Sequence, residues 1–163
     1  MVCDYISHHI DLITSELDSL EKGLKNEQFR HYEKARQHYK LIEFGIEFAF
    51  PFYAKYYLNG PAIKKSELEY GNRLFEPHGF QLLETHLYGN SAILTEAQLR
   101  FELTLMKDVL RQLKVKVNST IPKNETVFEM LKLECYRIAS LGLSGYDCTV
   151  NKTAVNRLRL YEE

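Results

Sequence analysis

The chain has 163 residues, near the usual size of a single domain and long enough to bury a hydrophobic core. Eight glycines and four prolines are too few for a collagen-like or low-complexity chain. Twenty-one basic residues nearly balance 22 acidic ones, and the resulting net charge of −1 gives no reason to expect binding to nucleic acid or to an anionic membrane.

The first segment has the spacing of an amphipathic helix. Its aliphatic residues recur every three or four positions, which is the period of one face of an α-helix. They are Ile6, Ile10, Ile13, Leu17, Leu20 and Leu24. Because a strand alternates with a period of two, the pattern predicts a helix that packs this face against a core.

The second segment carries an aromatic stripe that two charges interrupt. Its apolar members are Phe29, Tyr32, Tyr39, Ile46 and Phe50. Arg36 and Glu43 lie on the same stripe, where charges are rarely buried unless they are paired. Seven residues is a long separation for a direct ion pair, so we expect each to reach a partner on another helix, with Glu84 and Glu134 as candidates. The arrangement suits either a polar network that specifies the fold or a ligand site.

Aromatic residues are concentrated in this second segment, where ten of the 20 lie between Phe29 and Tyr57. Such a stripe is typical of a core, although it would also suit stacking on a flat ligand such as haem or contact with a partner protein. Pro51 should kink the helix or end its first part, because proline removes a backbone donor and clashes with the preceding turn. Asn59–Pro61 then predicts the end of the helix, and residues 64–71 an exposed loop.

A short helix is predicted from Pro77 to Gly89, since proline suits the first helical position and glycine the left-handed position after a C-cap. Gln81 and Glu84 share one face of this helix. If that face turns inward, Glu84 becomes a ligand or a hydrogen-bond acceptor inside the bundle. The plainer alternatives are a solvated Glu84 on a surface helix, or a buried Glu84 paired with Arg36.

Two further helices are expected in the second half. Thr95 and Gln98 form a capping box that opens the first of them. Its apolar stripe comprises Leu99, Leu103, Met106, Leu110, Leu113 and Val117. The second is predicted from Val127 to Leu141, followed by a turn and a terminal helix over Val150–Tyr161. We expect it to direct four residues inward, namely Phe128, Leu131, Cys135 and Ile138. These elements predict an all-α fold, an antiparallel bundle of four longer helices with one or two short ones, in a single domain over residues 1–163.

The sequence lacks the motifs that would commit it to a particular chemistry. Its three cysteines, Cys3, Cys135 and Cys148, form neither a C-x-x-C nor a C-x-x-C-H motif, so a redox pair and covalently attached haem are not predicted. Cys135 is interpreted as a small buried hydrophobic residue. The six histidines include no H-x-x-x-H pair, which leaves a metal site weakly supported by local spacing. No apolar run reaches the roughly 18 residues that span a membrane.

Three parts of the sequence resemble the imelysin-like helical domains: residues 39–44, Asn59–Pro61 and Glu76–Glu84. The form they resemble most is the one fused ahead of a dihaem cytochrome-c peroxidase module in exported Bacteroidetes proteins. Ile138–Asp147 is similar to the end of that domain. The resemblance implies the N-terminal helical domain of a larger polypeptide that is periplasmic or associated with the outer membrane.

Imelysins carry a G-x-H-x-x-E motif, which is considered a candidate metal site and is associated with iron uptake and a disputed peptidase activity. The matching residues here are Gly79, Gln81 and Glu84. Gln81 stands where the family has histidine, and a neutral amide is a poor ligand for a transition metal. This departure argues against an imelysin-type metal site and against peptidase activity.

Two functional hypotheses follow from the resemblance. The first is a non-catalytic domain of a cytochrome-c peroxidase family protein, which docks to the adjoining haem module or to an electron-donor protein. Haem c is then expected only in a downstream domain. The second is an imelysin-like domain that binds iron or haem in iron acquisition. Its candidate polar cluster comprises Glu84, Gln81, Glu43 and Arg36.

Overall fold

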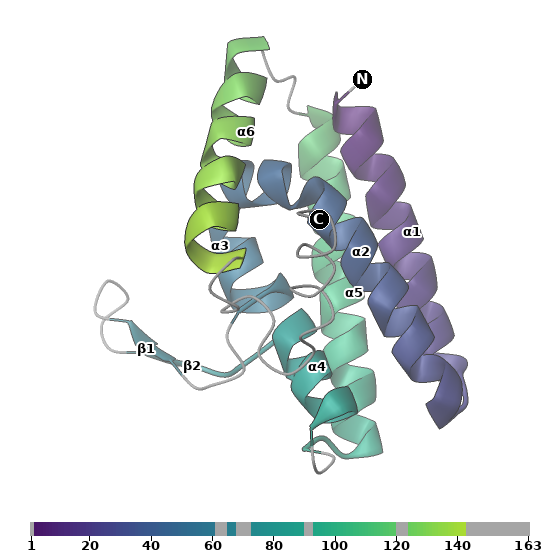
Figure 1. Ribbon diagram of the computed structural model, residues 1–163. Coiled ribbons are helices and arrows are strands. Elements are labelled where there is room, and N and C mark those ends of the chain that lie inside the picture. The colour runs from purple at the N-terminus through teal and green to yellow at the C-terminus, as the bar shows by residue number, and fades with distance from the viewer. Residues whose placement is uncertain (1, 61–64, 68–72, 90–92, 120–123, 143–163) are drawn as a thin grey trace, which may run out of the picture.

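The computed structural model describes residues 2–60, 65–67, 73–89, 93–119 and 124–142 (Figure 1). Its α-helices are α1 (Val2–Lys22), α2 (Lys25–Ala49), α3 (Pro51–Tyr53), α4 (Phe80–Tyr88), α5 (Glu96–Ser119) and α6 (Asn124–Arg137). Two π-helical turns, η1 (Ala54–Leu58) and η3 (Ile138–Gly142), extend α3 and α6. Strands β1 (Lys65–Glu67) and β2 (Arg73–Phe75) form a small hairpin. Helices dominate the described chain, which confirms the predicted all-α class.

Helix α1 packs against both α2 and α5, and ion pairs give the direction of α5 relative to α1. Lys107 of α5 contacts Asp18 of α1 at 2.7 Å, whereas Lys114, farther along α5, contacts Asp11 at 2.5 Å. Residues of rising number on α5 thus pair with residues of falling number on α1, so the two helices are antiparallel. Within the described ranges, no helix is long and apolar enough to cross a membrane.

The apolar stripes predicted for α1 and α5 form the centre of the core. Every member of the α5 stripe is buried, and so is every member of the α1 stripe except Leu24. Leu24 is exposed because α1 already ends at Lys22 and Leu24 precedes α2. The capping box is confirmed: the Thr95 backbone N–H donates to Gln98 Oε1 at 2.9 Å, and the Gln98 N–H donates to Thr95 Oγ1 at 3.3 Å.

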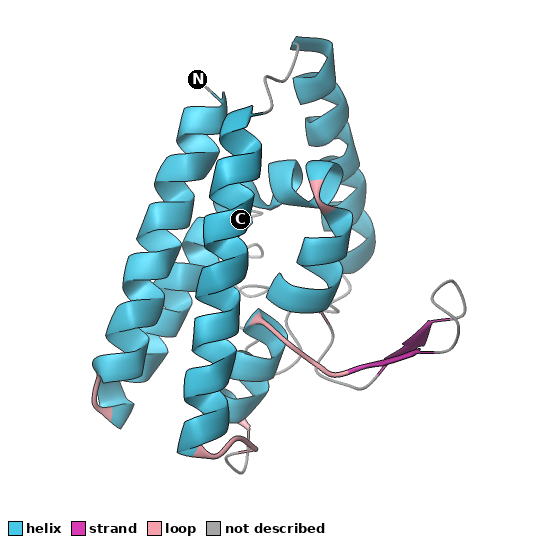
Figure 2. Cartoon of the chain, turned by 180° about the vertical axis from the view of Figure 1, so that it is seen from behind, coloured by secondary structure: helices cyan, strands magenta, loops and turns pink. Residues whose placement is uncertain are grey.

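Proline and glycine positions shape the middle of the chain largely as predicted. Helix α2 ends at Ala49, and Pro51 opens α3, where its missing N–H removes no helical hydrogen bond. The π-helical turn η1 then ends at Leu58, directly before Asn59. The exposed loop predicted for residues 64–71 is wrong in part, because residues 65–67 form β1. This strand pairs antiparallel with β2, with Lys65 opposite Phe75, and the hairpin projects away from the bundle (Figure 2).

The short helix α4 is real but differs from its prediction at both ends. It begins at Phe80, three residues after Pro77, and Gly79 is its N-cap. Gly79 has φ of +89°. Gly89, predicted to be left-handed, is extended, with φ of −71° and ψ of 163°. The glycine that uses its conformational freedom therefore lies before this helix instead of after it.

Helix α6 is the main departure from the predicted bundle. The central apolar cluster draws on α1, α2, η1, α4 and α5, and among the described residues of α6 Met130 is a buried apolar side chain that lies outside this cluster. Phe128, Leu131 and Ile138, predicted to point inward, are 73%, 46% and 47% exposed, and Cys135 is also exposed. Three of the four long helices thus complete the core, and α6 packs chiefly on the outside of α2. The predicted helix over Val150–Tyr161 lies outside the described residues.

Candidate functional site

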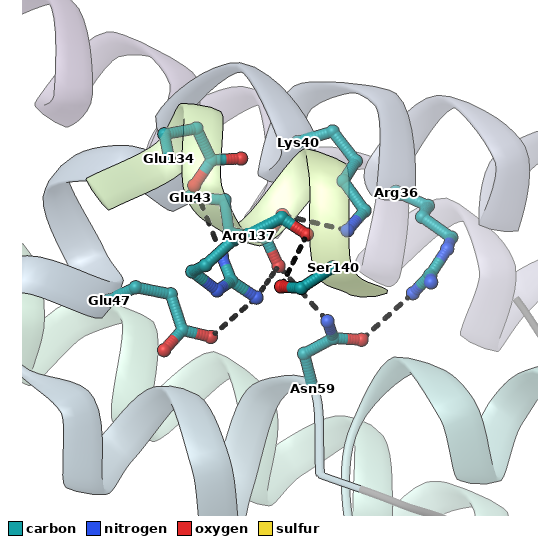
Figure 3. Close-up of polar contacts among 8 residues, drawn as sticks. All are labelled: Arg36, Lys40, Glu43, Glu47, Asn59, Glu134, Arg137 and Ser140. Atoms are coloured by element: carbon teal, nitrogen blue, oxygen red, sulfur yellow. Dashed lines mark hydrogen bonds and ion pairs between the residues drawn. The ribbon is translucent and has the colours of Figure 1, made fainter. Parts of the chain in front are cut away.

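A buried network of charged side chains lies where α6 and Asn59 meet α2 (Figure 3). At its centre is Glu43, whose exposed fraction is 1%. The Lys40 ammonium donates to Glu43 Oε2 at 2.7 Å, one helical turn away. The Asn59 amide donates to Glu43 Oε1 at 3.0 Å. These bonds replace the water that Glu43 loses on burial, which makes a charged carboxylate tolerable there.

Arg137, the last residue of α6, joins this network from the other side. Its Nη2 atom lies 3.4 Å from Glu43 Oε1 and 3.2 Å from Glu47 Oε1. Its Nη1 atom donates to Glu134 Oε2 at 3.1 Å. A single guanidinium therefore connects three carboxylates and ties the end of α6 to α2.

Asn59 connects the two charges that the sequence singled out. Arg36 Nη1 donates to Asn59 Oδ1 at 3.1 Å, while the amide nitrogen of Asn59 reaches Glu43. We call the residues joined by these contacts, together with Ser140 of η3, the Glu43 network. Its members are Arg36, Lys40, Glu43, Glu47, Asn59, Glu134, Arg137 and Ser140.

The Glu43 network is balanced in charge. Three cations, Arg36, Lys40 and Arg137, face three carboxylates, Glu43, Glu47 and Glu134 (Figure 3). Burial raises the pKa of Glu134, and the nearby Glu43 carboxylate raises it further, against the opposing effect of Arg137. Because Lys40 and Arg137 already engage the carboxylates and Arg36 binds Asn59, the arrangement favours a role in holding α6 in place over a role in proton transfer.

The sequence anticipated part of this site. Arg36 and Glu43 do have partners away from α2, as expected for charges on an apolar stripe, and Glu134 enters the network through Arg137. Asn59 and Arg137 were missed as members. Asn59 was recognised as part of a segment that ends a helix, but not as a hydrogen-bonding partner. The spacing of the residues around Arg137 does not indicate that its side chain faces α2.

The motif that resembles G-x-H-x-x-E lies at the start of α4. Gly79 closes against η1: a Cβ atom there would lie 2.2 Å from the Leu58 carbonyl oxygen, so no larger residue fits. Gln81 and Glu84 are both buried, and the exposed fraction of Glu84 is 0%. The polar face of α4 therefore turns inward, one of the alternatives that the sequence left open.

Helix α4 is held against α2 through its first residue. The Tyr32 hydroxyl donates to the Phe80 carbonyl oxygen at 3.2 Å, and the Arg36 guanidinium lies 5.9 Å from the centre of the Phe80 ring. Arg36 thus contacts Asn59 within the Glu43 network and also Phe80, the residue before Gln81. Of the four predicted cluster residues, the structure joins Arg36 to Glu43 through Asn59, and Gln81 and Glu84 are buried on α4.

A third buried carboxylate, Glu102 of α5, was missed entirely by the sequence reasoning. It accepts the backbone N–H of Gly79 at 2.6 Å and lies 2.8 Å from Nδ1 of His78. The Tyr57 ring stacks on the His78 imidazole, with ring centres 6.0 Å apart. The hydrogen bond to Glu102 raises the pKa of His78. These contacts hold the residues that precede α4 against α5. The sequence around Glu102 does not indicate this role, because Glu102 is a glutamate next to the apolar stripe of α5.

Across the described residues, no group of three or more histidine, cysteine, aspartate and glutamate side chains is placed to hold a metal ion. Glu84 therefore has no such set around it in this part of the chain. Comparison with protein families, curated proteins and solved structures gives no match. The likeness to imelysin-like domains stays a prediction from the sequence.

Proposed function

We propose that this chain is a non-catalytic docking domain of an exported cytochrome-c peroxidase family protein, and that α6 carries its docking surface. The observation that carries the proposal is the outward apolar stripe of α6. This α6 stripe consists of Phe128, Leu131, Cys135 and Ile138, all exposed.

Solvent exposure of the α6 stripe runs against the usual behaviour of an amphipathic helix, which buries its apolar face. Contiguous apolar patches with a polar rim commonly mark surfaces that bind another protein. Burying a side chain such as Phe128 or Leu131 gains about 1.5 to 3 kcal/mol. A partner that covers the stripe would therefore gain enough free energy for specific association.

The Glu43 network explains how α6 stays in place without burying its stripe. Arg137 attaches the end of the helix to Glu43 and Glu47 of α2 through charged hydrogen bonds. Met130 is the buried apolar side chain on this helix, whereas the side chains of the α6 stripe stay exposed and remain for a partner. A surface held rigidly before binding loses less conformational entropy on association.

The haem module expected downstream is the occupant that this geometry favours. Helix α6 continues through η3 to Gly142, so a module joined farther along the same polypeptide would reach the stripe at high effective concentration. The exposed charges beside the stripe, Glu129 and Lys132, lie 3.6 Å apart and offset each other. We therefore expect an apolar face on the haem module.

A crosslinking experiment on the longer polypeptide tests this proposal. The natural gene is read beyond Glu163 and expressed with whatever follows, carrying a photoreactive phenylalanine analogue in place of Phe128 or Tyr136. We expect two C-x-x-C-H motifs downstream and crosslinks from both positions to peptides of the haem module.

Phe101 provides the matched control, because it is an exposed aromatic residue on α5, away from the α6 stripe. The analogue at position 101 should give no crosslink to the haem module. A stop codon after Glu163, or equal crosslinking from positions 101 and 128, would overturn the proposal.

A further inference from the structure

Two histidines face each other across the α1–α2 interface. His9 of α1 and His38 of α2 place their Nδ1 atoms 3.1 Å apart. The ring centres are 5.2 Å apart and the planes are inclined by 36°. One Nδ1 donates its hydrogen to the other, so both rings direct the same nitrogen toward a common point.

This spacing is also the one that a shared metal ion requires. Imidazole nitrogens bind zinc at about 2.0 to 2.1 Å, so two of them on one ion lie about 2.9 Å apart at a right angle and about 3.3 Å apart at a tetrahedral angle. The observed 3.1 Å falls between these values. We propose that His9 and His38 form a two-histidine site for a divalent transition-metal ion of the zinc or nickel type, with water completing the coordination.

Binding at this site requires only a change of tautomer. The ring that now donates from Nδ1 moves its proton to Nε2, which leaves two neutral imidazoles with both Nδ1 lone pairs available. No proton is lost, and the ion replaces the shared hydrogen. Imidazole is a preferred ligand for zinc, copper and nickel, whereas magnesium and calcium prefer oxygen.

The surroundings allow an ion and its water to enter. His9 is buried, but His38 is only half-buried, and the neighbouring Tyr5 and His8 are exposed. The Tyr5 ring meets His9 edge-on, with centres 4.5 Å apart, and orients its imidazole. The pair therefore lies at the edge of the helix interface, where an ion would bridge α1 and α2.

Nickel titration of the purified chain tests the site. Cys135 and Cys148 are first replaced by serine, so that these two thiols do not compete for the ion. Calorimetry should show one Ni²⁺ per chain, and paramagnetic broadening should remove the imidazole signals of His9 and His38 first. With Ni²⁺ at about a hundredfold excess over its Kd, Tm should rise by roughly 5 to 10 °C.

Variants identify the ligands. His38→Gln should abolish the rise in Tm and weaken Ni²⁺ binding at least tenfold, and His9→Gln should do the same if it folds. Because His38 is half-buried, its variant decides the outcome should His9→Gln fail to fold.

Two controls should keep the full effect of nickel. His31→Gln alters the other cross-helix histidine contact, with Glu16, and Glu84→Gln alters the glutamate that matches the imelysin motif. Loss of binding in either control with retention in His38→Gln would overturn the proposal. So would the absence of any nickel-dependent change in Tm. Neither result bears on docking through α6, which is tested separately by crosslinking.

Discussion

Glu43 and Glu102 are both almost fully buried carboxylates, but they differ in the partners that make their burial tolerable. Glu43 accepts hydrogen bonds from Lys40 and Asn59 and faces the Arg137 guanidinium. Glu102 instead accepts from His78 and from the backbone of Gly79. Histidine changes charge near neutral pH, so the stability of the Glu102 cluster responds to pH in that range.

The pH dependence of this cluster has a definite sign. The hydrogen bond to Glu102 raises the pKa of His78, burial opposes the rise, and the charges of Glu102 and Glu76 add to it. Protonated His78 is therefore favoured in the folded chain. Its stabilising effect is complete below the pKa of about 6.5 in the unfolded chain and is lost as pH rises through the higher folded value.

Urea unfolding of the native chain and of His78→Gln checks this prediction. The native chain should exceed the variant in free energy of unfolding by more at about pH 5.5 than at about pH 8.5. Groups common to both proteins cancel in the difference. An equal difference at the two pH values would show that His78 does not titrate against Glu102.

At the scale of elements, α6 is attached to α2 by the ion pairs of Arg137 and carries one buried apolar side chain, Met130, whereas α1, α2 and α5 share the central apolar cluster. Arg137 carries much of this attachment, because it contacts Glu43, Glu47 and Glu134. Arg137→Ala should lower the free energy of unfolding by about 1 to 3 kcal/mol, since Glu43 loses a charged donor while it stays buried. Chemical denaturation followed by far-UV circular dichroism measures the change.

Lys132→Ala is the matched control on the same helix. Lys132 is exposed and lies 3.6 Å from the equally exposed Glu129, so its removal should cost less than about 1 kcal/mol. Similar losses from the two variants would mean that α6 is not held by the Glu43 network.

The same element shows how far the sequence could predict this fold. Repeated apolar spacing predicted α1 and α5 well, because both helices bury their stripes in the core. The apolar residues of α6 are spaced just as regularly. This spacing predicts that one face of the helix is apolar, but it does not predict which surface covers that face. The hairpin was missed because strands of three residues are too short to show alternation. Arg36 and Glu43 were recognisable as charges that need partners, whereas Asn59 and Arg137 become partners only through tertiary contacts.

For the whole molecule, the central apolar cluster of the described residues forms without α6, whose buried Met130 lies outside it. Its members run from Ile6 to Val117 and come from α1, α2, η1, α4 and α5. We therefore expect a chain truncated after Ser119 to fold. Removing α6 altogether also exposes Glu43 to water, which is less costly than leaving it buried without Arg137.

Thermal unfolding of residues 1–119 tests this expectation. The truncated chain should unfold in one cooperative transition, with a lower Tm than the full chain and with dispersed amide signals in its NMR spectrum. A broad transition with strong binding of a hydrophobic dye would instead show that α6 is needed for fixed core packing.

The position of the core also sets an order of events during synthesis. Every residue of the central apolar cluster precedes residue 118, so the nascent chain carries this cluster before any part of α6 has been made. Domains tend to fold as units from the N-terminal side during synthesis. Helix α6 would then emerge beside helices that have already packed together. Its apolar stripe would be exposed to any segment that is synthesised after it.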